Sequence, residues 1–311
     1  RKNRLTLRGE MRLSTKITVL AIAALAYGSA AMAITHSLHL GARGGADMWL
    51  TDGRQVSLAG PSVGIDFEYA CRWDLAWNAV MGPKFGVSLV YANATHKLDY
   101  SEKYTNVDYY YETMDYAIKT GSYVEKINNV QVEFPLVLSF RVNGVAFGVG
   151  AKMMIPFARL RSLDVTNPVV TAYYDDFEVE VPDYIVIGKA TDGKLHQRGD
   201  SYIPRYNALV TAEIGYEWEM RGTTLDGSAR IGFQAFADYS VWNNYTNNPP
   251  QKRLIDIEPI LNPDFPPPTV KCNYLTDTYS SALNYVHVGV RLYYSFSITQ
   301  RRCYRCMFEV F

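Results

Sequence analysis

Long segments in which every second residue is apolar recur along this chain of 311 residues. Segment 63–73 shows the pattern clearly: its odd-numbered residues are apolar, and Asp66, Glu68 and Arg72 lie between them. Successive side chains of a β-strand point to opposite sides, so a period of two indicates strands with one apolar and one polar face. The pattern occurs in eight segments, at about 37–49, 63–73, 79–92, 130–140, 145–158, 205–219, 227–242 and 286–298.

These eight segments are longer than ordinary globular strands, which average about five or six residues. Their length suits a strand that crosses a membrane, which needs about 9–11 residues. The connections alternate between short turns, such as Asn143-Gly144, and long loops with clusters such as Pro266–Pro268. We therefore predict an all-β, eight-stranded antiparallel up-and-down transmembrane β-barrel. Its short turns and both termini would lie in the periplasm, and its long loops outside the cell.

The polar faces of the predicted strands carry equal numbers of bases and acids. The bases are Arg43, Arg72, Lys84, Arg141, Lys152, Arg230 and Arg291, and the acids are Asp47, Asp66, Glu68, Glu133, Glu213, Glu217 and Asp238. An eight-stranded barrel has an interior just wide enough to be filled by side chains. Because a buried unpaired charge costs several kcal/mol, we expect these residues to pair across a plugged lumen. The alternatives are a thin polar pore, or a soluble β-sandwich with its apolar faces inside.

The tryptophans and glycines favour lipid outside the barrel. All five tryptophans fall at predicted strand ends, where aromatic girdles meet the membrane interfaces. Trp49 and Trp242 would lie at the outer end, and Trp73, Trp77 and Trp218 at the periplasmic end. Glycine is frequent on the charged faces, where it weakens an exposed strand but makes room inside a narrow barrel.

The N-terminal segment Met11–Ala33 is typical of a secretory signal. It has a charged start, an apolar run at 17–26 and the small-x-small sequence Ala31-Met32-Ala33. A membrane anchor is the alternative, but the run is short for a helical span. We divide the chain into an N-terminal extension with a cleavable signal (1–33), a barrel (34–298) and a C-terminal tail (299–311).

The second long loop, at about 93–128, is rich in tyrosine. Tyrosine offers rigid amphipathic contact area at low entropic cost. Tyr104, Tyr109, Tyr110, Tyr111 and Tyr116 are therefore candidates for binding an extracellular glycan or protein. Alternatively, these residues extend the strands and pack on one another. In the third loop, segments 177–181 and 184–187 alternate and Thr191-Asp192-Gly193 marks a turn, so we predict a β-hairpin there.

Composition argues against several other functions. The 31 Lys and Arg balance the 31 Asp and Glu, so the chain lacks the basic surplus of a nucleic-acid binder. No nucleophile motif accompanies the five histidines, so we expect no enzyme; a loop-borne hydrolase built from His96 or His196 with Ser and Asp is the alternative. Cys303 and Cys306 form a lone C-x-x-C without further ligands, so we expect neither a metal nor a cofactor.

One segment resembles a known group of barrels. Residues 130–151 read VQVEFPLVLSFRVNGVAFGVGA, in which Glu133 to Arg141 and Gly148 to Gly150 match an "x-I-P-L-L-L-x-x-R" strand, a tight turn and a "G-x-G" strand. This resembles the outer-membrane β-barrel families of Bacteroidota, including the PorT-like group, and the OmpA-type eight-stranded barrels. The resemblance implies an outer-membrane location, with membrane lipids and the barrel-assembly machinery as partners. The PorT name suggests a secretion-linked role.

Overall fold

The computed structural model describes residues 34–51, 57–76, 79–107, 113–166, 169–174, 178–185, 194–200, 204–220, 229–243, 253–257, 270–279 and 283–298. The predicted signal segment and C-terminal tail lie outside these ranges. So do Trp77, Tyr109, Tyr110 and Tyr111, together with Cys303 and Cys306.

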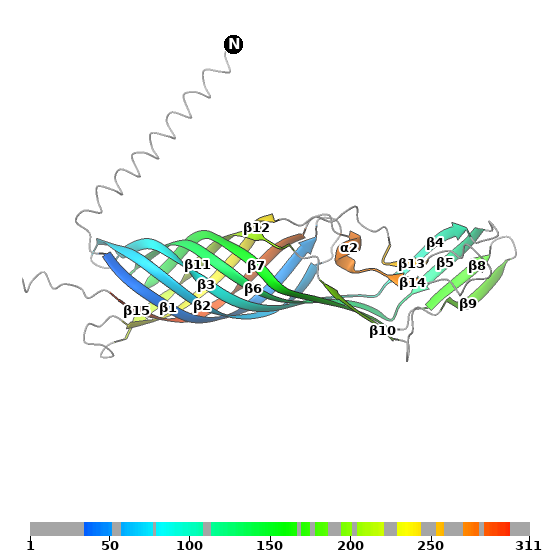
Figure 1. Cartoon of the computed structure of the whole chain (residues 1–311), viewed down its shortest axis with the longest axis horizontal. Helices are drawn as coiled ribbons and strands as arrows, with labels where there is room; N and C mark the ends of the chain where they lie inside the picture. Colours follow the sequence, from blue (N-terminus) through cyan, green and yellow to red (C-terminus); the bar gives the residue numbers. More distant parts are fainter. Residues whose placement is uncertain are drawn as a thin grey trace, which may run out of the picture.

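Eight long antiparallel strands form a closed ring, which confirms the predicted barrel (Figure 1). The strands are β1 (Ile34–Thr51), β2 (Ser57–Ala76), β3 (Ala79–Leu98), β6 (Ser122–Val142), β7 (Val145–Thr166), β11 (Asn207–Glu219), β12 (Ala229–Asn243) and β15 (Leu283–Ser297). Each pairs with the next along the chain, and β1 closes the ring by pairing with β15 from Ser37↔Ser297 to Thr51↔Leu283. This order is an up-and-down meander.

The two ends of the barrel differ in their connections. At one end, β6 and β7 are joined by Asn143 and Gly144, which have φ angles of 51° and 87°. Positive φ at both central residues identifies the tight hairpin turn that suits the twist of paired strands. We call this the short-turn end. β1 starts and β15 finishes there, and the long connections leave from the opposite, long-loop end (Figure 1).

The apolar faces of the barrel strands point outward. Ile65, Leu136 and Ile214 are each at least 60 % exposed, whereas Glu133, which precedes the outward-facing Phe134, is fully buried. A soluble sandwich would bury these apolar side chains and expose the charges. The sandwich alternative is therefore wrong, and the broad exposed apolar surface is that of a barrel surrounded by hydrocarbon.

Beyond the long-loop end, β6 and β7 continue into a second structured region, which we call the extension (Figure 1). There β10 (Lys194–Asp200) pairs with the Leu160–Thr166 part of β7. A separate four-stranded sheet consists of β4 (Ser101–Val107), β5 (Thr113–Lys119), β8 (Val169–Tyr174) and β9 (Val179–Ile185). A short pair, β14 (Val270–Cys272) with β13 (Ile255–Ile257), and the helix α2 (Leu275–Tyr279) complete it. No described helix is both long and apolar enough to cross a bilayer.

The hairpin predicted around the turn Thr191–Gly193 is wrong. The turn itself lies outside the described residues, but the strands on either side of it pair elsewhere, β9 with β8 and β10 with β7. The β8–β9 register shifts between Val170↔Ile185 and Ala172↔Val181, which places an irregularity in β9 near Pro182. Proline is tolerated at such bulges because it lacks the N–H that a regular ladder needs.

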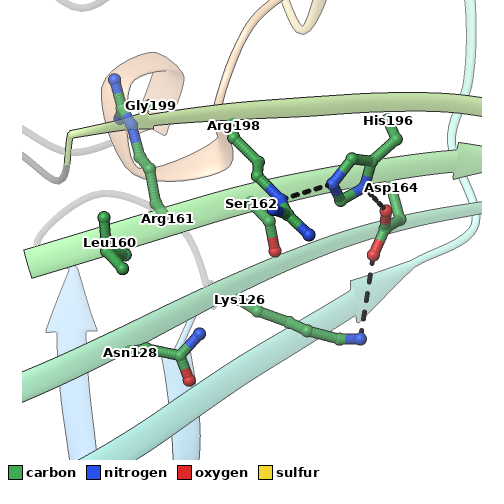
Figure 2. A pocket seen from close by; sticks show the side chains of 9 residues that line it. All are labelled: Lys126, Asn128, Leu160, Arg161, Ser162, Asp164, His196, Arg198 and Gly199. Carbon is green, nitrogen blue, oxygen red and sulfur yellow. Dashed lines mark hydrogen bonds and ion pairs between the residues drawn. The ribbon is translucent and has the colours of Figure 1, made fainter.

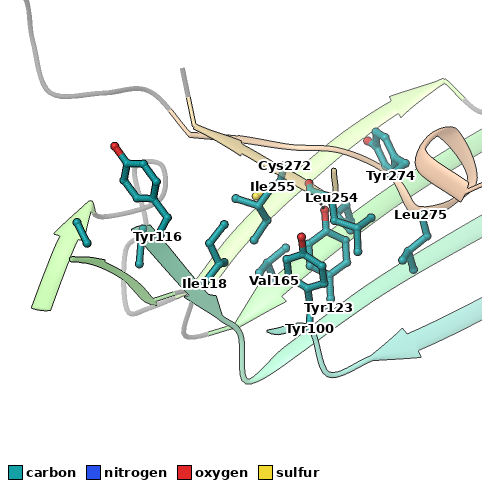
Figure 3. Close-up of a cluster of buried hydrophobic side chains, with 13 residues drawn as sticks. Tyr100, Tyr116, Ile118, Tyr123, Val165, Leu254, Ile255, Cys272, Tyr274 and Leu275 are labelled. Atoms are coloured by element: carbon teal, nitrogen blue, oxygen red, sulfur yellow. Dashed lines mark hydrogen bonds between the residues drawn. The ribbon is translucent and has the colours of Figure 1, made fainter. Parts of the chain in front are cut away.

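The extension has its own apolar core. Tyr100, Tyr116 and Tyr123 lie in it with aliphatic residues of β5, β7, β8 and the β13–β14 pair (Figure 3). The Tyr123 hydroxyl donates a hydrogen bond to the Leu254 carbonyl oxygen at 3.3 Å, which ties β6 to the last long connection. Part of the tyrosine-rich segment thus forms strands whose rings pack together, as the alternative interpretation of this loop expected.

Candidate functional site

The lumen is the most highly charged part of the molecule. All of the fourteen charged residues predicted to face it are buried except Arg141, whose side chain is 12 % exposed. They come from every strand of the barrel, because alternate residues of each strand point inward. Three groups of contacts run along the barrel axis from the short-turn end towards the long-loop end.

At the short-turn end, Glu217 of β11 binds two arginines. Its Oε1 atom lies 2.9 Å from Nη2 of Arg72, and its Oε2 atom lies 3.1 Å from Nη1 of Arg141. The Tyr293 hydroxyl also donates a hydrogen bond to Oε1, at 2.8 Å. The third predicted base at this end, Arg230, does not contact Glu217. It pairs with Glu219 at 3.1 Å, and the Glu219 side chain is 66 % exposed.

In the middle of the lumen, each of two bases contacts both of two acids. Lys84 Nζ lies 2.6 Å from Glu213 Oε2 and 3.3 Å from Glu68 Oε2. Arg291 Nη1 lies 2.6 Å from Glu68 Oε1, and Nη2 lies 3.5 Å from Glu213 Oε2. Arg291 also donates a hydrogen bond to Gln234. Each charge therefore has an opposite charge on another strand.

Nearer the long-loop end, the pairs involve a histidine that sequence reasoning did not include. Arg43 binds Glu133 at 2.8 Å and Asp66 at 3.2 Å, and Lys152 binds Asp238 at 2.9 Å. His287 lies between two carboxylates, 3.4 Å from Asp47 and 3.5 Å from Asp238. Its position was predictable: His287 lies four residues before Arg291 on one strand, and therefore on the same face.

An apolar layer covers the charged lumen at the long-loop end. It is a cluster of buried side chains from different barrel strands, namely Trp49, Leu58, Ala94, Ile127, Met154, Leu209, Leu283 and Tyr285. The Trp49 and Tyr285 rings lie 4.7 Å apart between centroids. The girdle position predicted for Trp49 is therefore wrong. Trp49 has the same parity as Arg43 and Asp47 on β1 and so points inward with them.

The other tryptophans fit an external position where the structure describes them. Trp218 and Trp242 are both more than half exposed. Trp73 is half-buried and alternates with the buried Arg72. Trp242 has the parity of the inward-facing Asp238, but a β-bulge between the pairs Ala208↔Trp242 and Leu209↔Ser240 reverses its direction. Trp77 lies outside the described residues.

Of the five candidate binding tyrosines, the structure describes the side chain of Tyr116 alone. Tyr116 is buried in the core of the extension, so the role predicted for it in external contact is wrong: its face of β5 packs inward with Ile118. Tyr104 lies opposite Tyr116 in the β4–β5 register. Tyr109, Tyr110 and Tyr111 lie outside the described residues.

Burial also controls the chemistry of a cysteine in this core. Cys272 lies on β14 among the apolar residues of the extension. Desolvation raises the pKa of its thiol from the ordinary value of 9.0 to about 12. A thiol is nucleophilic only as the thiolate, so Cys272 is a structural rather than a reactive residue.

Residues of β6, β7 and β10 line a pocket of about 540 Å³ (Figure 2). Lys126, Asp164, His196 and Arg198 form a row along one side of it. Asp164 contacts Nδ1 of His196 and lies 3.7 Å from Lys126 Nζ, and Arg198 Nε donates to His196 Nε2 at 2.9 Å. The sequence analysis missed this pocket, because the local pattern of residues 194–200 does not show that this segment pairs with β7.

Ser162 also lines this pocket, so part of a Ser/His/Asp set is present. In a catalytic triad, the histidine nitrogen remote from the acid accepts the serine proton. Here that nitrogen, Nε2 of His196, already accepts a hydrogen bond from Arg198. His96 is not among the residues that line this pocket. The described residues contain no group of three or more side chains suited to holding a metal ion.

A closed eight-stranded antiparallel ring with an apolar exterior and a charged interior defines the class of transmembrane β-barrel proteins. No protein-family model matches the chain. No curated protein matches it either.

Among solved structures, the chain resembles Ail, the attachment invasion locus protein of Yersinia pestis, at 9 % identity, with 85 % of this chain and 97 % of that chain covered and a TM-score of 0.22. It resembles the CymD monoaromatic hydrocarbon channel at 6 % identity, covering 85 % and 88 %, with a TM-score of 0.16. A Pseudomonas aeruginosa FadL homologue matches at 7 % identity, covering 85 % and 90 %, with a TM-score of 0.14. Scores this low carry no argument about function.

Proposed function

We propose that this protein is an outer-membrane barrel with a closed lumen, which serves as a scaffold that presents the extension for recognition or surface contact. The observation that carries the proposal is the double closure of the lumen. Ion pairs join strands across its middle, and the apolar layer around Trp49 covers the charges on the long-loop side.

The ion pairs suit closure better than passage. Lys84 on β3 contacts acids on β2 and β11, and Arg291 on β15 contacts the same two acids. A permeating ion would have to replace these contacts inside a narrow lumen, where a broken pair leaves uncompensated charge and costs about 3–5 kcal/mol. It would then have to pass an apolar layer, which offers an ion no hydration.

The extension supports the second part of the proposal. It is joined to the barrel by two continuous strands and has its own core, so it holds a fixed shape at the long-loop end. Binding residues are often carried by segments that a rigid scaffold positions. Its partner would be an extracellular glycan or protein, contacted by exposed side chains such as Tyr173 rather than by the buried Tyr116.

Planar-bilayer recordings test the closed lumen. The purified full-length chain is expected to give no discrete current steps. A variant that combines Trp49→Ala, Lys84→Ala and Arg291→Ala removes both closures and is expected to conduct, which shows that inserted protein would be detected. Discrete ohmic steps from the unmodified protein would contradict the proposal and favour the alternative of a narrow pore.

We further propose that both termini lie in the periplasm and the extension outside the cell. The support is the asymmetry of the barrel, since short periplasmic turns and long outer loops are usual. An epitope inserted beside Gly121, between β5 and β6, should be labelled on intact cells, whereas one inserted at Asn143 should not. The opposite labelling pattern would reverse the orientation.

Relationship to the PorT-like group is also a proposal, supported by the strand motifs at Glu133–Arg141 and Gly148–Gly150. If it holds, deletion of the gene should impair secretion by the cell. A deletion strain with normal secretion would remove the secretion-linked role while leaving the barrel assignment intact. We propose no catalytic role, because Arg198 occupies the His196 nitrogen that a serine would need.

A further inference from the structure

We propose that the pocket between β6, β7 and β10 binds the phosphate group of a lipid headgroup in the leaflet at the long-loop end of the barrel. Two cationic side chains, those of Lys126 and Arg198, line this pocket together with one carboxylate, that of Asp164. Its volume of about 540 Å³ is sufficient for a headgroup. The inference rests on the barrel crossing a bilayer, but not on whether the lumen conducts.

The pocket lies at the depth where lipid headgroups are expected. Leu160 lines it and is 61 % exposed, as is Phe157 three residues earlier on β7. These two residues belong to the outward-facing apolar surface. Ser162, two residues beyond Leu160 on the same face, lies about 7 Å further along the strand. The apolar surface thus passes directly into a polar, cationic one, as it should where hydrocarbon meets headgroups.

On this face of the sheet, two cationic side chains, those of Lys126 and Arg198, lie beside a single carboxylate, that of Asp164. Asp164 pairs with Lys126 and accepts a hydrogen bond from His196, so its charge is already engaged. Arg198 uses only Nε to contact His196, and its Nη groups add four further N–H donors. A guanidinium with free amino groups suits two oxygens of a phosphate. An anion in the pocket would balance the remaining charge.

The polar groups are held in place before any ligand arrives. Lys126, Ser162 and Arg198 lie side by side, since Ser162 pairs with Lys126 on one strand and with Arg198 on the other. Asp164 contacts both Lys126 and His196, and Arg198 contacts His196, so these side chains hold one another in place. Such preorganisation reduces the entropic cost of binding. The Ser162 hydroxyl adds a neutral donor next to the cations.

A lipid is favoured over a free anion because the pocket borders the apolar surface. A headgroup phosphate in the pocket would leave its acyl chains against the exposed Leu160 and Phe157. Inorganic phosphate would gain nothing from these residues. Packing of acyl chains against these residues is thus available to an amphiphile but not to a free anion.

Native mass spectrometry of the full-length protein in detergent tests the inference. The probes are phosphatidic acid, diacylglycerol with the same acyl chains, and inorganic phosphate. We expect phosphatidic acid to bind well above the other two. The double variant Lys126→Gln with Arg198→Gln should lose at least about tenfold in affinity, because it removes both cationic groups that would contact the phosphate. Lys119→Gln, which removes a charge outside the pocket, should bind like the unmodified protein.

Three results would overturn the inference. Equal binding of diacylglycerol would show that the phosphate is not recognised. Equal binding of inorganic phosphate would show a free-anion site rather than a lipid site. Unchanged binding by the folded double variant would place the lipid elsewhere. The variant Arg198→Lys keeps the charge without the forked geometry and should bind with intermediate affinity, which keeps the test informative if the double variant fails to fold.

Discussion

Lys84 Nζ lies 2.6 Å from Glu213 Oε2, across a lumen that separates β3 from β11. The two strands are not neighbours, since β6 and β7 stand between them on the shorter way around the ring. The contact is therefore a transverse link between opposite walls. It stabilises the barrel only while both partners are charged, because either charge alone would be buried without compensation.

The first prediction concerns this link. Replacing Lys84 by Met should lower the free energy of unfolding by about 3–5 kcal/mol, because Glu68 and Glu213 would then share a single base, Arg291. Unfolding by urea in lipid vesicles, followed by tryptophan fluorescence, measures the change. Glu219→Gln removes an ion pair whose carboxylate is exposed and should cost no more than about 1 kcal/mol. Equal losses in the two variants would refute the distinction.

The second prediction compares two tryptophans near the long-loop end. Trp49→Ala should cost about 3–5 kcal/mol, because it leaves a cavity in the apolar layer beside Tyr285. Trp242→Ala should cost much less in detergent, since Trp242 is 57 % exposed. Urea titrations of both variants in the same detergent measure the difference. If Trp242→Ala proved the more damaging, the inward and outward assignments would be reversed.

The third prediction concerns crowding inside the lumen. A Cβ atom at Gly232 would lie 2.2 Å from Tyr293 Cζ, on the cross-strand partner of Gly232. Gly232→Ala should therefore displace the Tyr293 ring from Glu217 and cost about 1–3 kcal/mol. Gly44→Ala is the matched control, because the nearest atom to its Cβ, the Ser62 carbonyl oxygen, is 3.8 Å away. If Gly232→Ala left the free energy of unfolding unchanged, the Tyr293 ring would be free to move aside without loss of stability.

The fourth prediction concerns pH. With Cys71, Cys303 and Cys306 replaced by serine, Cys272 is the single thiol, and its pKa of about 12 should slow alkylation by iodoacetamide at pH 8 roughly a thousandfold relative to the denatured chain. The raised pKa favours the folded state below pH 9, and this contribution is lost as pH rises from 9 to 12. Rapid alkylation of the folded protein at pH 8 would show that β14 opens.

Alternation along the chain was enough to predict the eight barrel strands and which residues share a face. It placed Arg43 with Asp47, and Glu213 with Glu217, because parity is a local property. The same parity, followed further, would also have placed Trp49 and His287 in the lumen. The bulge that turns Trp242 outward was not predictable in this way, because a register shift depends on the partner strand.

The extension was beyond local reasoning for a related reason. The pairing of β10 with β7, and of β8 with β5, joins segments that are distant along the chain. A period of two shows that a segment is extended, but not which strand it joins. The pocket containing Lys126, Asp164 and His196 exists only because of such pairings.

β7 runs without interruption from the short-turn end into the extension and contains 22 residues. At about 3.4 Å per residue it is about 70 Å long, more than twice the roughly 30 Å thickness of a bilayer's hydrocarbon core. A pull on the four-stranded sheet of the extension would therefore be carried by the same strand that places Lys152 beside the lumenal acids. Mechanical load on the extension would thus reach the charged interior of the barrel through a single ribbon.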